Sequence, residues 1–228
     1  MGPHVHRTHH SGWLRASVLG ANDGVLSISS VALGVAAAHT GQTGIMIASV
    51  AALVAGTFSM AAGEYVSVSS QADTERADLE IERAALQNEY ASEHAELADI
   101  YVRRGLDAEL ASKVAEQLMA HDALDAHARD DIGITGALSA RPLQAAVASS
   151  ISFGIGGVVP LLVAIAVPRT ALVPSIVAVS LVFLSALGAI AARAGGAPIM
   201  AGATRVLIWG VLAMAVTSAV GALVGSVV

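Results

Sequence analysis

The sequence of 228 residues contains no cysteine. This absence excludes disulfide bonds, iron–sulfur clusters and zinc sites built from thiolates. Any bound metal ion must therefore use oxygen, imidazole or thioether ligands. Basic residues are also outnumbered, with 12 Lys and Arg against 18 Asp and Glu, so the chain offers no basic face for a phosphate backbone and a nucleic-acid partner is excluded.

Charge of either sign is scarce over long stretches. Charged residues make up 13% of the chain and hydrophobic residues 55%, which is too apolar for an ordinary soluble domain. Five apolar segments are long enough to cross about 30 Å of hydrocarbon as helices. They cover residues 16–38, 44–69, 144–167, 171–192 and 204–226. The sequence therefore predicts an all-α integral membrane protein whose recurrent glycines let five transmembrane helices pack closely.

The charge that is present lies between the second and third spans. Sixteen of the 18 carboxylates occur between Asp73 and Asp131. We therefore predict that residues 71–143 form a helical acidic domain that binds metal ions. Residues 16–70 would carry the first two transmembrane helices, and residues 144–228 the last three.

Two helices are predicted within this acidic domain. The first covers about residues 73–103 and ends at Gly105, a residue suited to a helix C-terminus. The second runs from Asp107, an N-cap residue, to Asp131, and Gly133 ends it. Because neither proline nor glycine separates the second span from the first of these helices, we expect the two to be continuous.

The basic residues predict the orientation. With the N-terminal tail (residues 1–15) in the cytoplasm, only Arg169 of the 12 Lys and Arg residues lies outside. This asymmetry places the acidic domain in the cytoplasm, and we expect the protein in the cell (inner) membrane. The tail contains four histidines that are either solvated, a purification remnant or a metal-binding tail: His4, His6, His9 and His10.

Two carboxylates, Asp23 and Glu64, lie inside predicted spans. An ionisable group in hydrocarbon costs about 3 kcal/mol on insertion scales, so such residues usually face a polar path. Met60 lies one helical turn before Glu64, and its thioether suits Fe²⁺ and later transition metals better than Mg²⁺ or Ca²⁺. We predict that these three residues line a transport pathway. For Asp23 the alternative is a structural residue that caps a broken helix.

Four glutamates of the acidic domain share one helical stripe. At about 100° per residue, Glu82, Glu89, Glu93 and Glu96 project within roughly 60° of one another. Like charges at this spacing repel, and a divalent cation would remove the repulsion. The four are therefore candidate metal ligands, and a solvated acidic face is the alternative.

The second helix of the acidic domain adds a smaller candidate site. His127 and Asp131 are four residues apart, which puts an imidazole and a carboxylate on one face that can chelate a borderline metal. An incidental surface pair is the alternative. We expect Asp122, Asp125 and Asp130 to be solvated or helix-terminal charges.

Four segments that contain these residues strongly resemble the vacuolar iron transporter family, including its bacterial members. They are Ser11–Gly24, Ala55–Asp73, Ala98–Leu106 and Val114–Ile134. The resemblance covers nearly the whole chain and is densest in the first two spans and the acidic domain.

The resemblance implies a homodimer of five-helix subunits that exchanges Fe²⁺, and often Mn²⁺, for protons. Its pathway would lie between the subunits and be lined by Asp23 and Met60, while glutamates of the cytoplasmic helices collect the metal. Some relatives carry a glutamate where this chain has Ala52, so proton coupling would rest on Glu64 or Asp23. Some eukaryotic members have methionines at the place of His127 and Ala128.

The sequence therefore predicts a transporter rather than an enzyme. It would export Fe²⁺ or Mn²⁺ as substrate, hold no tightly bound cofactor, and accept Zn²⁺ or Co²⁺ in the cytoplasmic domain. The alternative is a membrane-tethered metal buffer or sensor without transport. A ferritin-like di-iron oxidase is disfavoured, because the acidic domain lacks the Glu-x-x-His pair of such sites.

Overall fold

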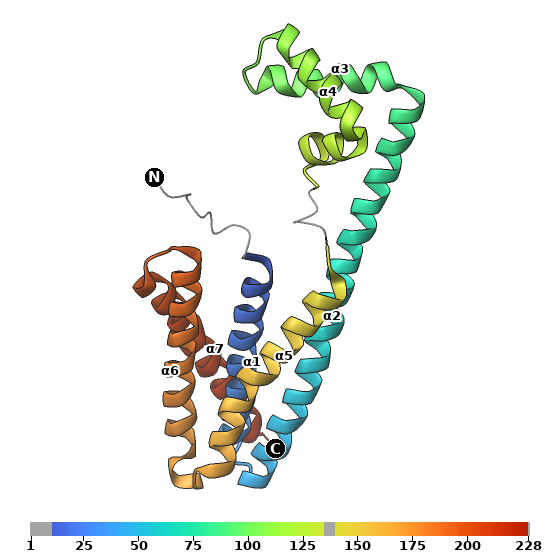
Figure 1. Ribbon diagram of the computed structural model, residues 1–228. Helices are drawn as coiled ribbons and strands as arrows, with labels where there is room; N and C mark the ends of the chain where they lie inside the picture. The colour runs from blue at the N-terminus through green and yellow to red at the C-terminus, as the bar shows by residue number, and fades with distance from the viewer. Residues whose placement is uncertain (1–10, 135–139, 228) are drawn as a thin grey trace. The chain divides into compact units, whose positions relative to one another are not determined.

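The computed structural model describes residues 11–134 and 140–227. All the secondary structure in these residues is helical, as predicted (Figure 1). The elements are α1 (Ser11–Ala37), α2 (Gln42–Asn88), α3 (Tyr90–Arg103), α4 (Ala108–His127), the π-helical turn η2 (Ala128–Ile132), α5 (Pro142–Ala166), α6 (Arg169–Gly195) and α7 (Ile199–Gly225).

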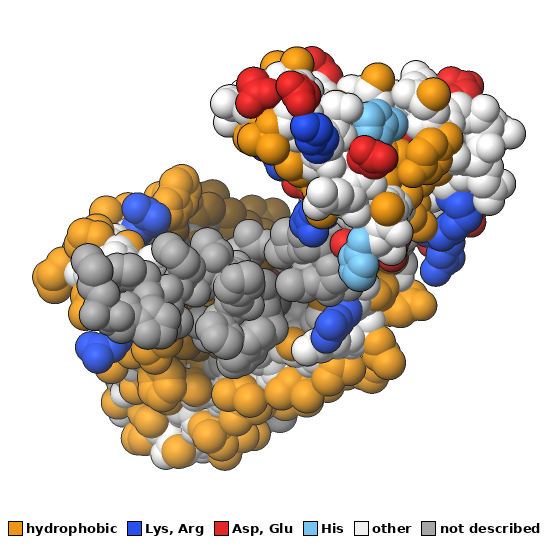
Figure 2. Space-filling model, turned by 45° about the horizontal axis from the view of Figure 1, so that its top comes forward, with side chains coloured by type: hydrophobic (Ala, Val, Ile, Leu, Met, Phe, Trp, Pro, Cys, Tyr) orange, Lys and Arg blue, Asp and Glu red, His pale blue; other side chains and the backbone are white. Residues whose placement is uncertain are grey.

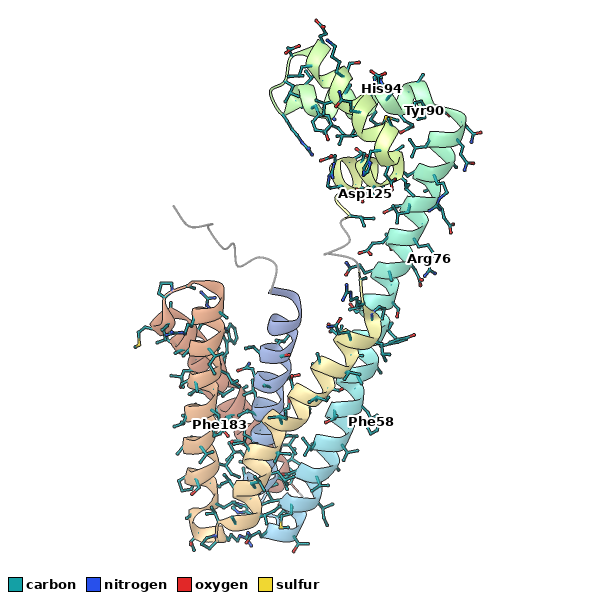
Figure 3. All side chains as sticks on the ribbon, in the orientation of Figure 1. Phe58, Arg76, Tyr90, His94, Asp125 and Phe183 are labelled. Atoms are coloured by element: carbon teal, nitrogen blue, oxygen red, sulfur yellow. The ribbon has the colours of Figure 1, made fainter. Side chains whose placement is uncertain are left out.

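Five of the described helices are long and apolar enough to cross a membrane, which agrees with the predicted number of candidate spans. They are α1 from Ser17 onward, α2, α5, α6 and α7. Large apolar side chains are exposed on them, among them Phe58 of α2 and Phe183 of α6 (Figure 3). Hydrophobic side chains cover much of the visible surface of these helices, whereas the visible acidic side chains gather over the part of the chain that contains α3 and α4 (Figure 2). A continuous apolar surface of this kind suits contact with lipid.

The chain forms two compact units. The span unit runs to Tyr65 and resumes at Leu143, and the insert unit is Val66–Pro142. Helix α2 belongs to both, because it continues without interruption from Gln42 to Asn88. The expected continuity of the second span with the first helix of the insert is therefore confirmed.

Glycines bring the helices of the span unit into backbone contact at several crossings. A Cβ atom at Gly188 of α6 would lie 2.7 Å from the carbonyl oxygen of Gly202 in α7, and a Cβ at Gly24 of α1 would overlap the backbone of Phe153 in α5. Small residues permit this close approach in lipid, as the sequence predicted. Gly63 of α2 differs, because a Cβ there would meet nothing within 4 Å.

The predicted ends of the insert helices are confirmed. Gly105 follows α3 with a φ of +104°, and Gly133 follows η2 with a φ of +82°, so both occupy the conformation that glycine adopts readily. Asp107 caps α4, since its carboxylate accepts a hydrogen bond of 3.0 Å from the backbone N–H of Leu110.

The prediction of one helix over residues 73–103 is wrong. The helix breaks at Glu89, whose φ of −133° and ψ of 34° are not helical, and α3 begins at Tyr90. Asn88 favours such a break, because its side chain bonds to the carbonyl of Ala84 and it is a weak helix former. The turn lets α3 fold against α4 and bury Leu97, which a straight helix would leave in water.

Candidate metal site

Three side chains from three helices converge inside the insert unit. Glu82 comes from α2, Glu93 from the first turn of α3, and His127 from the end of α4, and their donor atoms all lie within 4.8 Å of one another. The Nδ1 atom of His127 is 2.9 Å from a carboxylate oxygen of Glu82 and 3.7 Å from one of Glu93. Two carboxylates and one imidazole form a donor set for a borderline divalent metal.

This cluster is buried, and several of its donor atoms lack hydrogen bonds. The side chain of His127 is 0% exposed and Glu82 and Glu93 are each 8% exposed. Neither ring nitrogen of His127 nor the Oε1 atom of Glu82 has a hydrogen-bond partner among the described residues, although Nδ1 and Oε1 are close. An unsatisfied buried polar group costs about 1–3 kcal/mol. A cation between the three side chains would satisfy Nδ1 of His127 and Oε1 of Glu82 together, because Nδ1 is the ring nitrogen that faces both glutamates.

The electrostatics of the cluster also favour a cation. Burial raises the pKa of the Glu82 carboxyl above its usual value, and His127 opposes this effect. The nearby negative charges of Glu93, Asp131 and Glu96 raise the same pKa further. A carboxylate binds metal only when ionised, so a divalent cation here would compete with a proton on Glu82.

A kink in α4 aims His127 into the cluster. Asp122 interrupts the helix with a φ of −158° and a ψ of 99°, and its carboxylate accepts a hydrogen bond of 3.0 Å from the N–H of Asp125. Asp122 therefore starts a second helical segment, as expected of a helix-terminal charge. The predicted helix from Asp107 to Asp131 is therefore kinked at Asp122, and its last residues form the π-helical turn η2, a form that often marks functional sites.

Asp130 of η2 is held by residues that surround its carboxylate. The Tyr101 hydroxyl donates a hydrogen bond of 2.6 Å, and the guanidinium groups of Arg104 and Arg129 donate bonds of 2.6 Å and 2.9 Å. Burial alone would raise the pKa of Asp130, but these hydrogen bonds lower it to about 2. The side chain is only 10% exposed. Nothing in the local sequence pattern distinguishes Asp130 from the other acids.

The six predicted ligands of the acidic domain thus separate into two groups. Glu82, Glu93 and His127 come together, whereas Glu89, Glu96 and Asp131 are exposed. Glu96 and Asp131 remain close enough for their negative charges to raise the pKa of Glu82. The expected single stripe of four glutamates is not present, because the break at Glu89 divides it between two helices.

The residues predicted for the membrane path lie on two helices of the span unit. Asp23 is half-buried on α1 and accepts a hydrogen bond of 3.0 Å from the Ser27 hydroxyl, and α1 is continuous through it, which argues against the cap of a broken helix. Met60 and Glu64 are half-buried on α2, one turn apart. Among the described side chains, no hydrogen bond joins Asp23 to Glu64.

The N-terminal histidines predicted as a possible metal-binding tail lie outside the described residues: His4, His6, His9 and His10.

Comparison with known proteins agrees with these features. The model of the VIT family matches residues 14–222. A vacuolar iron transporter of Acanthamoeba castellanii is 48% identical over 212 residues, which cover 92% of this chain and 78% of the relative. Vacuolar iron transporter homolog 2 of Oryza sativa is 35% identical, and the match covers 91% of this chain and 88% of the relative. VIT-like transporter 1b of Glycine max is 32% identical, and the match covers 94% of this chain and 77% of the relative. The chain belongs to the VIT family.

Proposed function

We propose that this protein exports Fe²⁺ or Mn²⁺ from the cytoplasm in exchange for protons, with the insert unit facing the cytoplasm and collecting the ion. The observation that carries the proposal is the buried convergence of Glu82, Glu93 and His127 in a chain with five candidate spans. Three relatives are named as transporters, and two of these names contain the words iron transporter. These names support a metal ion as the substrate.

The chemistry of the insert favours transition metals over Mg²⁺ and Ca²⁺. Those hard ions prefer sites made only of oxygen, whereas Fe²⁺, Co²⁺ and Zn²⁺ gain from imidazole. His127 supplies that nitrogen at the centre of the cluster. The insert would therefore bind Zn²⁺ and Co²⁺ as well as the transported ion, and no tightly bound cofactor is required.

In the span unit, Asp23, Met60 and Glu64 would form the pathway of a homodimer. The ion would bind to the ionised carboxylates, and protons from the far side would displace it, because carboxylates ligate metal only in the ionised form. Some relatives carry a glutamate at the position of Ala52, and this chain lacks it. We therefore assign the coupled proton to Glu64. The inward proton gradient would then set the direction of transport. We place the protein in the cell (inner) membrane, whereas the relatives from Acanthamoeba castellanii and Oryza sativa are named vacuolar.

Flux into inverted membrane vesicles with an acidic lumen tests this proposal. Addition of Fe²⁺ or Mn²⁺ should produce metal uptake and make the lumen more alkaline. Asp23→Asn and Met60→Ala should abolish the flux while the protein remains folded in detergent. Matched controls are Asp73→Asn and Met200→Ala, which alter an exposed acid and an exposed methionine and should transport normally.

Proton coupling needs a separate variant. Glu64→Gln should retain metal binding but lose the dependence of accumulation on the pH gradient. Full proton-dependent accumulation in this variant would move the coupling role to Asp23 or to the insert. Metal binding to the wild-type protein without any flux would instead indicate a membrane-tethered buffer or sensor.

A further inference from the structure

Asp130 ties the π-helical turn that follows His127 to helix α3. Besides the bonds to its carboxylate, its backbone carbonyl accepts a hydrogen bond of 3.1 Å from Arg104. The Arg104 guanidinium also lies over the ring of Tyr101, 5.4 Å from the ring centre. Tyr101 of α3 and Arg104, the C-cap residue of α3, therefore hold both the side chain and the main chain of Asp130.

Arg104, which anchors Asp130, lies in line with the candidate ligand Glu93. Arg104 follows Glu93 by eleven positions, which is close to three turns of α-helix, and its N–H still bonds to the carbonyl of Ile100, so the two side chains leave the axis of α3 in nearly the same direction. Leu97 and Ile100 lie between them and are buried on that face. The hydrogen bonds from this face to η2 therefore fix where the end of α4 lies along α3. They also fix how the end of α4 is rotated relative to α3.

We propose that Asp130 is a positioning residue that holds His127 in place to bind metal together with Glu82 and Glu93; the inference rests on the proposed role of the insert in collecting metal. Asp130 itself does not ligate the ion, because Tyr101, Arg104 and Arg129 occupy its carboxylate. Supporting groups of this kind preorganise ligands, and their loss typically lowers metal affinity about 10–100-fold.

A double-mutant cycle on the full-length protein in detergent separates positioning from a general structural role. Co²⁺ binding is measured by calorimetry, and the visible spectrum of bound Co²⁺ reports its ligands. The part of the heat and of the absorbance that is lost in Glu82→Gln is assigned to the insert site. Asp130→Asn should weaken this binding about tenfold, and Tyr101→Phe, which removes one hydrogen bond, should weaken it less. Asp99→Asn alters an exposed acid of α3 that pairs with Arg103, and this variant should bind Co²⁺ as wild type does.

The cycle is completed in a His127→Ala background. If Asp130 acts through His127, Asp130→Asn should there change the affinity by less than about twofold, and the spectrum should not change. Equal losses in both backgrounds, or unchanged Co²⁺ affinity in Asp130→Asn and Tyr101→Phe, would overturn the inference while leaving the proposed function intact. If wild type and Glu82→Gln bind Co²⁺ identically, the metal-collecting role of the insert fails, and the positioning role fails with it.

Discussion

The depressed pKa of Asp130 predicts that the insert unit loses stability in acid. Hydrogen bonds from Tyr101, Arg104 and Arg129 outweigh burial and lower the pKa from 3.8 to about 2. A shift of one unit corresponds to about 1.4 kcal/mol, so the ionised carboxylate stabilises the folded insert by about 2 kcal/mol. Because the folded-state pKa is the lower one, this contribution is complete above about pH 5 and is lost as the pH falls towards 2.

Hydrogen exchange of the amides in α3 and α4 measures this contribution in the full-length protein, once intrinsic exchange rates are corrected for pH. The opening free energy of wild type should exceed that of Asp130→Asn by about 2 kcal/mol at pH 6, and the gap should shrink steadily below pH 5. Asp99→Asn should show little gap at any pH, because exposed ion pairs contribute about 0–1 kcal/mol. A gap that stays constant with pH, or no gap at pH 6, would refute the assignment.

Three further outcomes are expected. Glu82→Gln should weaken Co²⁺ binding by more than the roughly tenfold that loss of a supporting group costs, whereas calorimetry of Glu89→Gln, which alters an exposed glutamate outside the cluster, should match wild type. Gly24→Ala should lower the free energy of unfolding by about 1–3 kcal/mol, because the new Cβ would overlap the backbone of Phe153, and the melting temperature in detergent should fall. An equal fall in Gly63→Ala, where a Cβ would meet nothing, would contradict this reason. Asp107→Ala should destabilise α4 by about 1 kcal/mol through loss of its N-cap, and unchanged hydrogen exchange at the start of α4 would count against it.

Local features of the fold could be predicted from the sequence because each depends on residues close together in the chain. The length and hydropathy of five apolar segments suffice to identify the spans. The caps at Gly105, Asp107 and Gly133 follow from the conformation or hydrogen bonding of single residues. The continuity of α2 follows from the absence of helix breakers between its membrane part and its polar part.

The candidate metal site depended on tertiary structure. Helical periodicity placed four glutamates on one stripe, but periodicity assumes a straight helix, and the break at Glu89 and the kink at Asp122 remove that assumption. Both breaks are stabilised by what they bring together: α3 buries its apolar face on α4, and Asp130 bonds to α3. These contacts join residues tens of positions apart, and no pattern within one helix contains them. The sequence alone thus determined which side chains could bind metal, and packing between helices decided that Glu82, Glu93 and His127 are the ones that meet.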